Sequence, residues 1–193
     1  MRTSRSRSWR AFDPAAPAAV PLRVVPRAAR ARILGLDPGS RLTGFGVIDC
    51  DGASTRYVAS GAIATPVGEF PARLQVIFER VRELVVEFRP EEIAIERVFV
   101  KRNPDSALKL GQARGAALCG AFNGAAAVFE YSPREIKMAI VGVGGAEKRQ
   151  VQHMVKALLQ LQARLSADAA DALAVALCHA HGRTLRARLG AAP

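Results

Sequence analysis

The sequence predicts an α/β protein with a mixed five-stranded sheet, three antiparallel strands followed by two parallel ones, flanked by helices. The first observation is a series of short apolar segments at 31–37, 43–50 and 55–65, separated by Pro-Gly and Asp-Gly turns. This pattern is typical of an antiparallel meander. The second observation is that helical and strand-like segments then alternate, which indicates a sheet with helices packed on its faces.

The first helix is expected at 71–90, because apolar residues recur there at helical intervals and Pro90 stops the pattern. A helix at 103–122 has Pro104 near its first turn, where a missing N–H is harmless. The remaining predicted elements are strands at 91–99 and 126–132 and helices at 133–142, 146–161 and 167–183.

The chain is strongly basic, with a formal net charge of +11 over 193 residues. Residues 1–30 hold seven Arg and one Asp, so they contribute +6 and leave +5 for the rest. We expect 1–30 to be a disordered basic extension, whose composition also resembles a transit peptide; both interpretations stay open. One folded domain is expected at 31–183 and a basic C-terminal tail at 184–193. A basic body favours polyanions, either nucleic acid or anionic lipid.

Two classes of protein are excluded by what the sequence lacks. It has no uninterrupted apolar stretch of about 18 residues, so we expect no membrane span. The cysteines Cys50, Cys119 and Cys178 are far apart and form no CxxC pair, which indicates neither a disulfide framework nor a zinc site. A cytoplasmic location fits best.

Four carboxylates stand out by their context. Asp37 ends the first predicted strand, and Glu96 lies near the end of the fourth. Asp168 and Asp171 are three residues apart on the last helix, on one face and among alanines that permit close packing. If the first and fourth strands are neighbours, their ends bring Asp37 and Glu96 together at the sheet edge where α/β proteins usually hold ligands.

Converging carboxylates stay ionised only with a cation among them, and oxygen ligands select hard ions such as Mg²⁺ or Mn²⁺. Each acid also has an ordinary interpretation. Asp37 could form the Pro-Gly turn, Glu96 could pair with Arg97 or Lys101, and Asp168 could cap its helix. Each is at least as probable as catalysis when taken singly, whereas all of them together are improbable.

Six segments resemble the RuvC family, the crossover-junction endodeoxyribonucleases that resolve Holliday junctions. They run in the family's order from about residue 32 to about 181: ILGLDPGSRLTGFGVID, AIERVF, NPDSALKLGQARG, VFEY, AEKRQVQHM and ADAADALAVA. The resemblance implies a ribonuclease-H-like fold and a homodimer. The family's acidic tetrad falls on Asp37, Glu96, Asp168 and Asp171, as both catalytic residues and metal ligands.

The resemblance also implies an activity. It is Mg²⁺-dependent paired nicking of opposing strands of four-way junction DNA, in homologous recombination and repair, leaving 5′-phosphate and 3′-hydroxyl ends. One or two ions per subunit are expected, with Mn²⁺ as a substitute. A junction branch-migration helicase complex of the RuvA and RuvB type is the expected partner.

Several residues are candidates for DNA contact. Phe99 could stack on an unpaired base, the role of the matching aromatic in the family, although core packing is the alternative. Lys101 and Arg102 would hold phosphates beside it. Lys137 and Lys148 match basic positions of the family, and Lys148 follows GVGG near a helix start that favours anions. For Arg134 and Arg149 a solvated helix face is expected, and Lys109 and Arg114 are undecided.

Gly111 and Gly115 form a flat stripe with Cys119 on one helix. We expect it to pack inside the monomer, with a dimer contact as the alternative. His153, His179 and His181 show no metal-ligand spacing, so we expect ordinary roles, with His179 near the acids as the alternative.

Two other functions remain as hypotheses. DPGS-x-x-TG after a strand resembles the first phosphate loop of actin-like phosphotransferases, but such enzymes need two lobes and a second phosphate motif. A non-catalytic junction-binding protein would need only the basic charge, and the complete acidic tetrad argues against it.

Overall fold

The computed structural model describes residues 30–52, 54–98 and 104–190. Its strands form one five-stranded sheet in the order β3-β2-β1-β4-β5. The antiparallel part contains β1 (Arg30–Asp37), β2 (Leu42–Asp51) and β3 (Ser54–Ala64). Two further strands, β4 (Glu92–Glu96) and β5 (Ala127–Tyr131), run parallel to β1. The predicted fold class is therefore confirmed.

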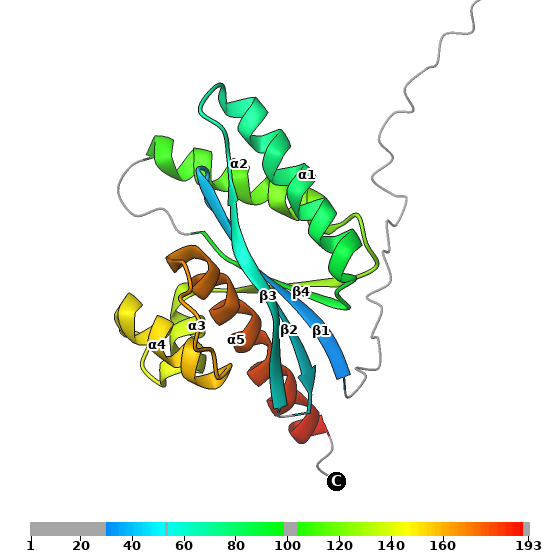
Figure 1. Ribbon diagram of the computed structural model, residues 1–193, viewed down its shortest axis with the longest axis vertical. Coiled ribbons are helices and arrows are strands. Elements are labelled where there is room, and N and C mark those ends of the chain that lie inside the picture. Colours follow the sequence, from blue (N-terminus) through cyan, green and yellow to red (C-terminus); the bar gives the residue numbers. More distant parts are fainter. Residues whose placement is uncertain (1–29, 53, 99–103, 191–193) are drawn as a thin grey trace, which may run out of the picture.

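Helices cover both faces of this sheet (Figure 1). On one face lie α1 (Phe70–Phe88) and α2 (Pro104–Ala121), and on the other lie α3 (Pro133–Val141), α4 (Lys148–Leu158) and α5 (Ala167–Gly190). Strand alternation divides the apolar side chains between two cores. Leu34 and Leu36 of β1 pack with α1 and α2, whereas Ile33 packs with the α5 layer.

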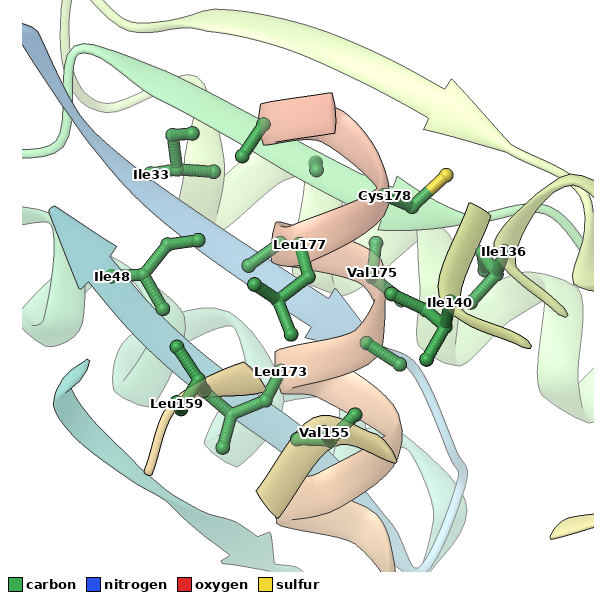
Figure 2. Close-up of a cluster of buried hydrophobic side chains, with 14 of the residues drawn as sticks. Ile33, Ile48, Ile136, Ile140, Val155, Leu159, Leu173, Val175, Leu177 and Cys178 are labelled. Carbon is green, nitrogen blue, oxygen red and sulfur yellow. The ribbon is translucent and has the colours of Figure 1, made fainter. Parts of the chain in front are cut away.

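The α5 layer has an apolar core built largely from one helix. Leu173 and Leu177 of α5 face Ile33 of β1 and Ile48 of β2, and all four side chains have no exposed surface (Figure 2). Ala172, Ala174 and Ala176 of the same helix are equally buried. The core on this face of the sheet therefore depends on how closely α5 approaches the strands.

Several element boundaries differ from the sequence-based expectation, most clearly in β4, α4 and α5. β4 ends at Glu96, although the apolar residues after it predicted a strand to 99. α4 begins at Lys148, where Glu147 and Gln150 form a capping box, rather than at 146. The last helix continues to Gly190 instead of ending at 183, because the following residues are mostly good helix formers without proline. The segment predicted as a tail is thus helical as far as Gly190.

The stripe of Gly111 and Gly115 does not pack inside the monomer. A Cβ built on either glycine meets no atom of the described residues within 4 Å. Cys119, on the same helix, is exposed. The expectation that this stripe packs within the subunit was wrong, because α2 instead turns Ala113 and Ala117 toward the core. None of the helices in the described ranges carries the long apolar stretch that a membrane span would need.

The glycines of β1 and β2 that face α5 permit an unusually close contact. A Cβ on Gly35 would overlap the carbonyl oxygen of Ala172 and lie 2.9 Å from the Cβ of Ala176. A Cβ on Gly46 would lie 2.7 Å from Cγ of Leu173. Real side chains do not approach so closely, so α5 lies at a distance from the sheet that only glycine allows.

Substitution of Gly35→Val is expected to destabilise the protein by about 1–3 kcal/mol or more, because the added atoms would push α5 away from β1. Urea unfolding followed by circular dichroism measures the loss. Gly145→Ala is the control, since a Cβ there meets no atom within 4 Å in the part of the chain that the structure describes. Equal stability of the two variants would contradict the close contact.

Candidate active site

Asp37 and Glu96 lie side by side because their strands are parallel neighbours. In the register of β1 and β4, Leu36 is opposite Ile95, and each acid follows directly on one of these residues. The two carboxyls are close enough that a side-chain hydrogen bond between them raises the pKa of Asp37 and lowers that of Glu96. The predicted meeting of these two acids at one sheet edge is what the strand order produces.

The start of α5 brings the second pair of acids to the same edge. Gly44 of β2 is the register partner of Asp37, and a Cβ on Gly44 would overlap the carbonyl oxygen of Asp168. The first turn of α5 therefore lies directly beside Asp37. Asp171, one turn later, is close enough for its charge to act on both Asp37 and Glu96.

The nearby positive charge is too small to keep all the carboxyls of this cluster ionised near their usual pKa values. Burial raises the pKa of Asp37 to about 8, and the charges of Glu96 and Asp171 add to this effect. The pKa values of Glu96 and Asp171 are also raised, in both cases chiefly by burial. Such shifts mean that removing a proton from this cluster is costly unless another cation replaces it.

Two lysines supply part of that charge. Lys148 Nζ, at the first residue of α4, donates to Asp171 Oδ2 at 2.5 Å. This hydrogen bond raises the pKa of Lys148, and the charges of Asp37 and Asp168 raise it further. Lys137 of α3 is near enough to Glu96 for its charge to lower the pKa of that acid. Both lysines predicted at the site are therefore at the acids.

The donor set fits a hard divalent cation. All four acids offer only carboxylate oxygens, the ligands that Mg²⁺ and Mn²⁺ prefer. In the orientations seen here, no three His, Cys, Asp or Glu side chains of the described residues are arranged to hold an ion. Because Lys148 Nζ already contacts Asp171 Oδ2, an ion bound by all four acids would require this ion pair to open.

The ordinary interpretations of single acids are not what the structure shows. Ser166, not Asp168, caps α5, since its Oγ accepts from the N–H of Ala169 at 3.3 Å. The turn after Asp37 is closed by Thr43, whose Oγ1 donates to the Gly39 carbonyl at 3.0 Å. Neither the helix cap nor the turn therefore uses the carboxylate of Asp168 or Asp37, and both belong to the acidic cluster.

Other predicted cations are engaged elsewhere. Arg97 pairs with Glu135 at 2.8 Å rather than with Glu96. Lys109 pairs with Asp105 at 2.7 Å. The predicted DNA-contact residues Phe99, Lys101 and Arg102 lie outside the described residues.

Arg114 also has partners within the fold. It pairs with Glu130 of β5 and donates from Nε to the backbone carbonyl of Glu96 at 3.3 Å. The undecided Arg114 is thereby assigned to supporting the end of β4. Arg134 and Arg149 are exposed, as expected for a solvated helix face.

The sequence-based reasoning missed one buried polar group. Glu92, His179 and Arg183 lie together at the end of β4 and α5 remote from the acids. His179 is thus neither near the acids nor isolated. The available signal was an acid within an apolar strand, together with a His and an Arg spaced four apart on an apolar helix.

The sequence is similar to those of known proteins over most of its length. The sequence profile of the family described as "Crossover junction endodeoxyribonuclease RuvC" matches residues 33–179. A protein of that name from Alkalilimnicola ehrlichii is 56% identical over 158 residues, 82% of this chain and 96% of its own length. Another of that name, from Marinobacter nauticus, is 62% identical over 151 residues, 77% of this chain and 85% of its own length.

Solved structures are similar to the same family. Thermus thermophilus RuvC in complex with a Holliday junction substrate has a TM-score of 0.75 at 34% identity, covering 81% of this chain and 96% of that one. The yeast mitochondrial Holliday junction resolvase Ydc2 has a TM-score of 0.60 at 11% identity, covering 82% and 83%, and so shares the ribonuclease-H-like fold. The profile match, the identities and the fold together show that this chain belongs to the RuvC family of crossover junction endodeoxyribonucleases.

Proposed function

We propose that this protein resolves four-way DNA junctions by metal-dependent hydrolysis of two opposing strands, in homologous recombination and DNA repair. The observation that carries the proposal is the convergence of Asp37, Glu96 and Asp171, with Asp168 beside them, at one edge of the sheet. Family membership favours this activity over an actin-like phosphotransferase. The acidic cluster favours it over a protein that only binds junctions.

The four acids would hold one or two Mg²⁺ ions, for which Mn²⁺ would substitute. When bound, such ions activate a water and stabilise the leaving oxygen, here giving 5′-phosphate and 3′-hydroxyl ends. The protein's own groups prepare this site. Asp37 and Glu96 would hold the ion in place of the proton that burial now favours on Asp37.

The lysines at the site would bind phosphates of the DNA. Lys137 and Lys148 lie beside the acids, where an approaching phosphate adds further negative charge. Release of Lys148 from Asp171 would free its ammonium to bind that phosphate. Phe99, Lys101 and Arg102 follow β4 in the sequence and would continue this contact, with Phe99 stacking on an unpaired base.

Paired nicking requires two active sites, and the exposed stripe on α2 is the surface that would join two subunits. Gly111 and Gly115 leave open space, and Cys119 lies on the same helix. Leu108 and Phe122, at either end of the stripe, are 66% and 63% exposed. A flat apolar helix face suits a self-complementary contact. A branch-migration helicase complex of the RuvA and RuvB type is the expected further partner.

Substitution of Asp37→Asn should abolish Mg²⁺-dependent cleavage of a four-way junction, by about 10³-fold or more, because the cluster loses a carboxylate ligand. Junction binding, measured by gel shift, should be retained. Asp51→Asn is the control, since Asp51 pairs with Arg30 at the surface. Cleavage by Asp37→Asn at the wild-type rate would contradict the site.

The metal-free protein should lose stability as pH rises. The pKa of Asp37 is about 8, raised from 3.8, so the folded state holds a proton that the unfolded state releases. This contribution is full below about pH 4 and is lost as pH rises toward about pH 8.

Bound Mg²⁺ replaces the proton, so its stabilising effect should increase with pH. Melting temperatures with EDTA and with Mg²⁺, at about pH 6 and about pH 8.5, measure this linkage. Asp37→Asn should remove most of the pH dependence. A stabilisation by Mg²⁺ that is equal at both pH values would argue against proton exchange at Asp37.

Substitution of Gly111→Arg should yield folded monomers, because the side chain enters open space in the subunit but would obstruct a partner. Light scattering measures the mass, and nick mapping should show single rather than paired cuts. Gly145→Arg, at another open position, should remain dimeric. A dimeric Gly111→Arg protein would place the interface elsewhere.

A further inference from the structure

A second cluster of charged side chains lies inside the protein, away from the acids. Glu92 of β4 and Arg183 of α5 are 7% and 6% exposed, and His179 of α5 has no exposed surface. Groups of this kind are rarely buried unless they are well paired. The proposed reaction at the acidic cluster makes no use of them.

The contacts of this cluster join three elements. Glu92 Oε2 lies 2.6 Å from His179 Nε2 and accepts from Arg183 Nε at 2.9 Å. His179 Nδ1 lies 2.6 Å from the hydroxyl of Tyr131 on β5. The His179 ring also lies against Phe129, with centroids 4.5 Å apart. One carboxylate of β4 is thus fixed to two consecutive turns of α5.

The rest of the contact between α5 and the sheet is formed chiefly by apolar and glycine residues. Gly35 and Gly46 face Ala172, Leu173 and Ala176 across it. Apolar burial is non-directional. This contact therefore determines the distance between α5 and the sheet more strongly than the position of α5 along its own helix axis. Hydrogen bonds are directional and weaken quickly with misalignment. A displacement of α5 by one residue, about 1.5 Å, would break the bonds to Glu92.

The same two elements carry the acids. Glu92 and Glu96 are four residues apart on the same face of β4. His179 follows Asp171 by eight residues on one continuous helix, about 12 Å along its axis. Because the helix is rigid over this length, fixing His179 to Glu92 also fixes Asp168 and Asp171 relative to Glu96.

We propose that Glu92, His179 and Arg183 are positioning residues that set the register of α5 on β4 and thereby the spacing of the metal-binding acids. This role rests on the proposed function of the acidic cluster. A purely structural cluster would affect the stability of the protein but leave the Mg²⁺ affinity of the folded molecules unchanged. The two roles are therefore separable by measurement.

The test compares Mg²⁺ affinity with stability in the full-length protein. Glu92→Gln keeps the shape of the side chain but removes its charge. It should raise the dissociation constant for Mg²⁺ by about tenfold, as loss of a supporting contact does. Calorimetric titration of Mg²⁺ measures the constant without any cleavage. Junction cleavage by this variant should recover as Mg²⁺ is raised.

Two further variants complete the design. Val81→Ala lowers stability through the core on the opposite face of the sheet, and should keep the wild-type Mg²⁺ constant. Where Glu92→Gln fails to fold, Glu92→Met combined with Arg183→Met removes the buried pair without leaving one charge alone. That double variant should show the same weakened Mg²⁺ binding.

A folded Glu92 variant that loses stability as Val81→Ala does, yet keeps the Mg²⁺ constant within about twofold of wild type, would overturn the positioning role and leave the proposed function intact. A wild-type protein that neither binds Mg²⁺ nor cuts junctions would overturn the proposed function, and the positioning role with it.

Discussion

The close contact between α5 and the strands β1 and β2 is the constraint on which the rest of the structure depends. Glycine at 35, 44 and 46 removes the side chains that would otherwise separate helix from sheet. The alanines of α5 complete a thin interface. Without this approach, the first turn of α5 would not lie beside Asp37, and the acids of the helix would not act on those of the sheet.

That approach has an electrostatic cost. Carboxylates brought together in a partly buried place raise each other's pKa, as Asp37 shows most strongly. The fold tolerates them because Lys148 and Lys137 lie close by and because Asp37 can retain a proton. The polar cluster around Glu92, at the far end of the same helix, is by contrast well paired. Helix α5 therefore connects the acidic cluster, whose charges repel one another, to the polar cluster around Glu92, whose charges are paired.

Much of this arrangement could be predicted from the sequence. The fold class and the helices on both faces follow from turn residues and periodicity, which act over short distances along the chain. The meeting of Asp37 with Glu96 was expected on the condition that the first and fourth strands are neighbours, and the structure pairs them. What could not be predicted depends on contacts between distant segments. The exposure of Gly111 depends on which face α2 turns to the core, and the pairing of Glu92 with His179 joins residues 87 positions apart. The helical continuation past 183 shows that a short basic segment gives little warning of its secondary structure.

The ion pair of Lys148 with Asp171 has a consequence for which ions the site accepts. The ammonium is already a monovalent cation at a carboxylate oxygen, held by a 2.5 Å contact. Replacing the ammonium with sodium or potassium would bring no additional positive charge to the cluster. A divalent ion would bring a second positive charge, which would stabilise the ionised forms of Asp37 and Glu96. We therefore expect Lys148 to make the resting cluster select ions by charge, with monovalent ions competing poorly for a place that a divalent ion can take.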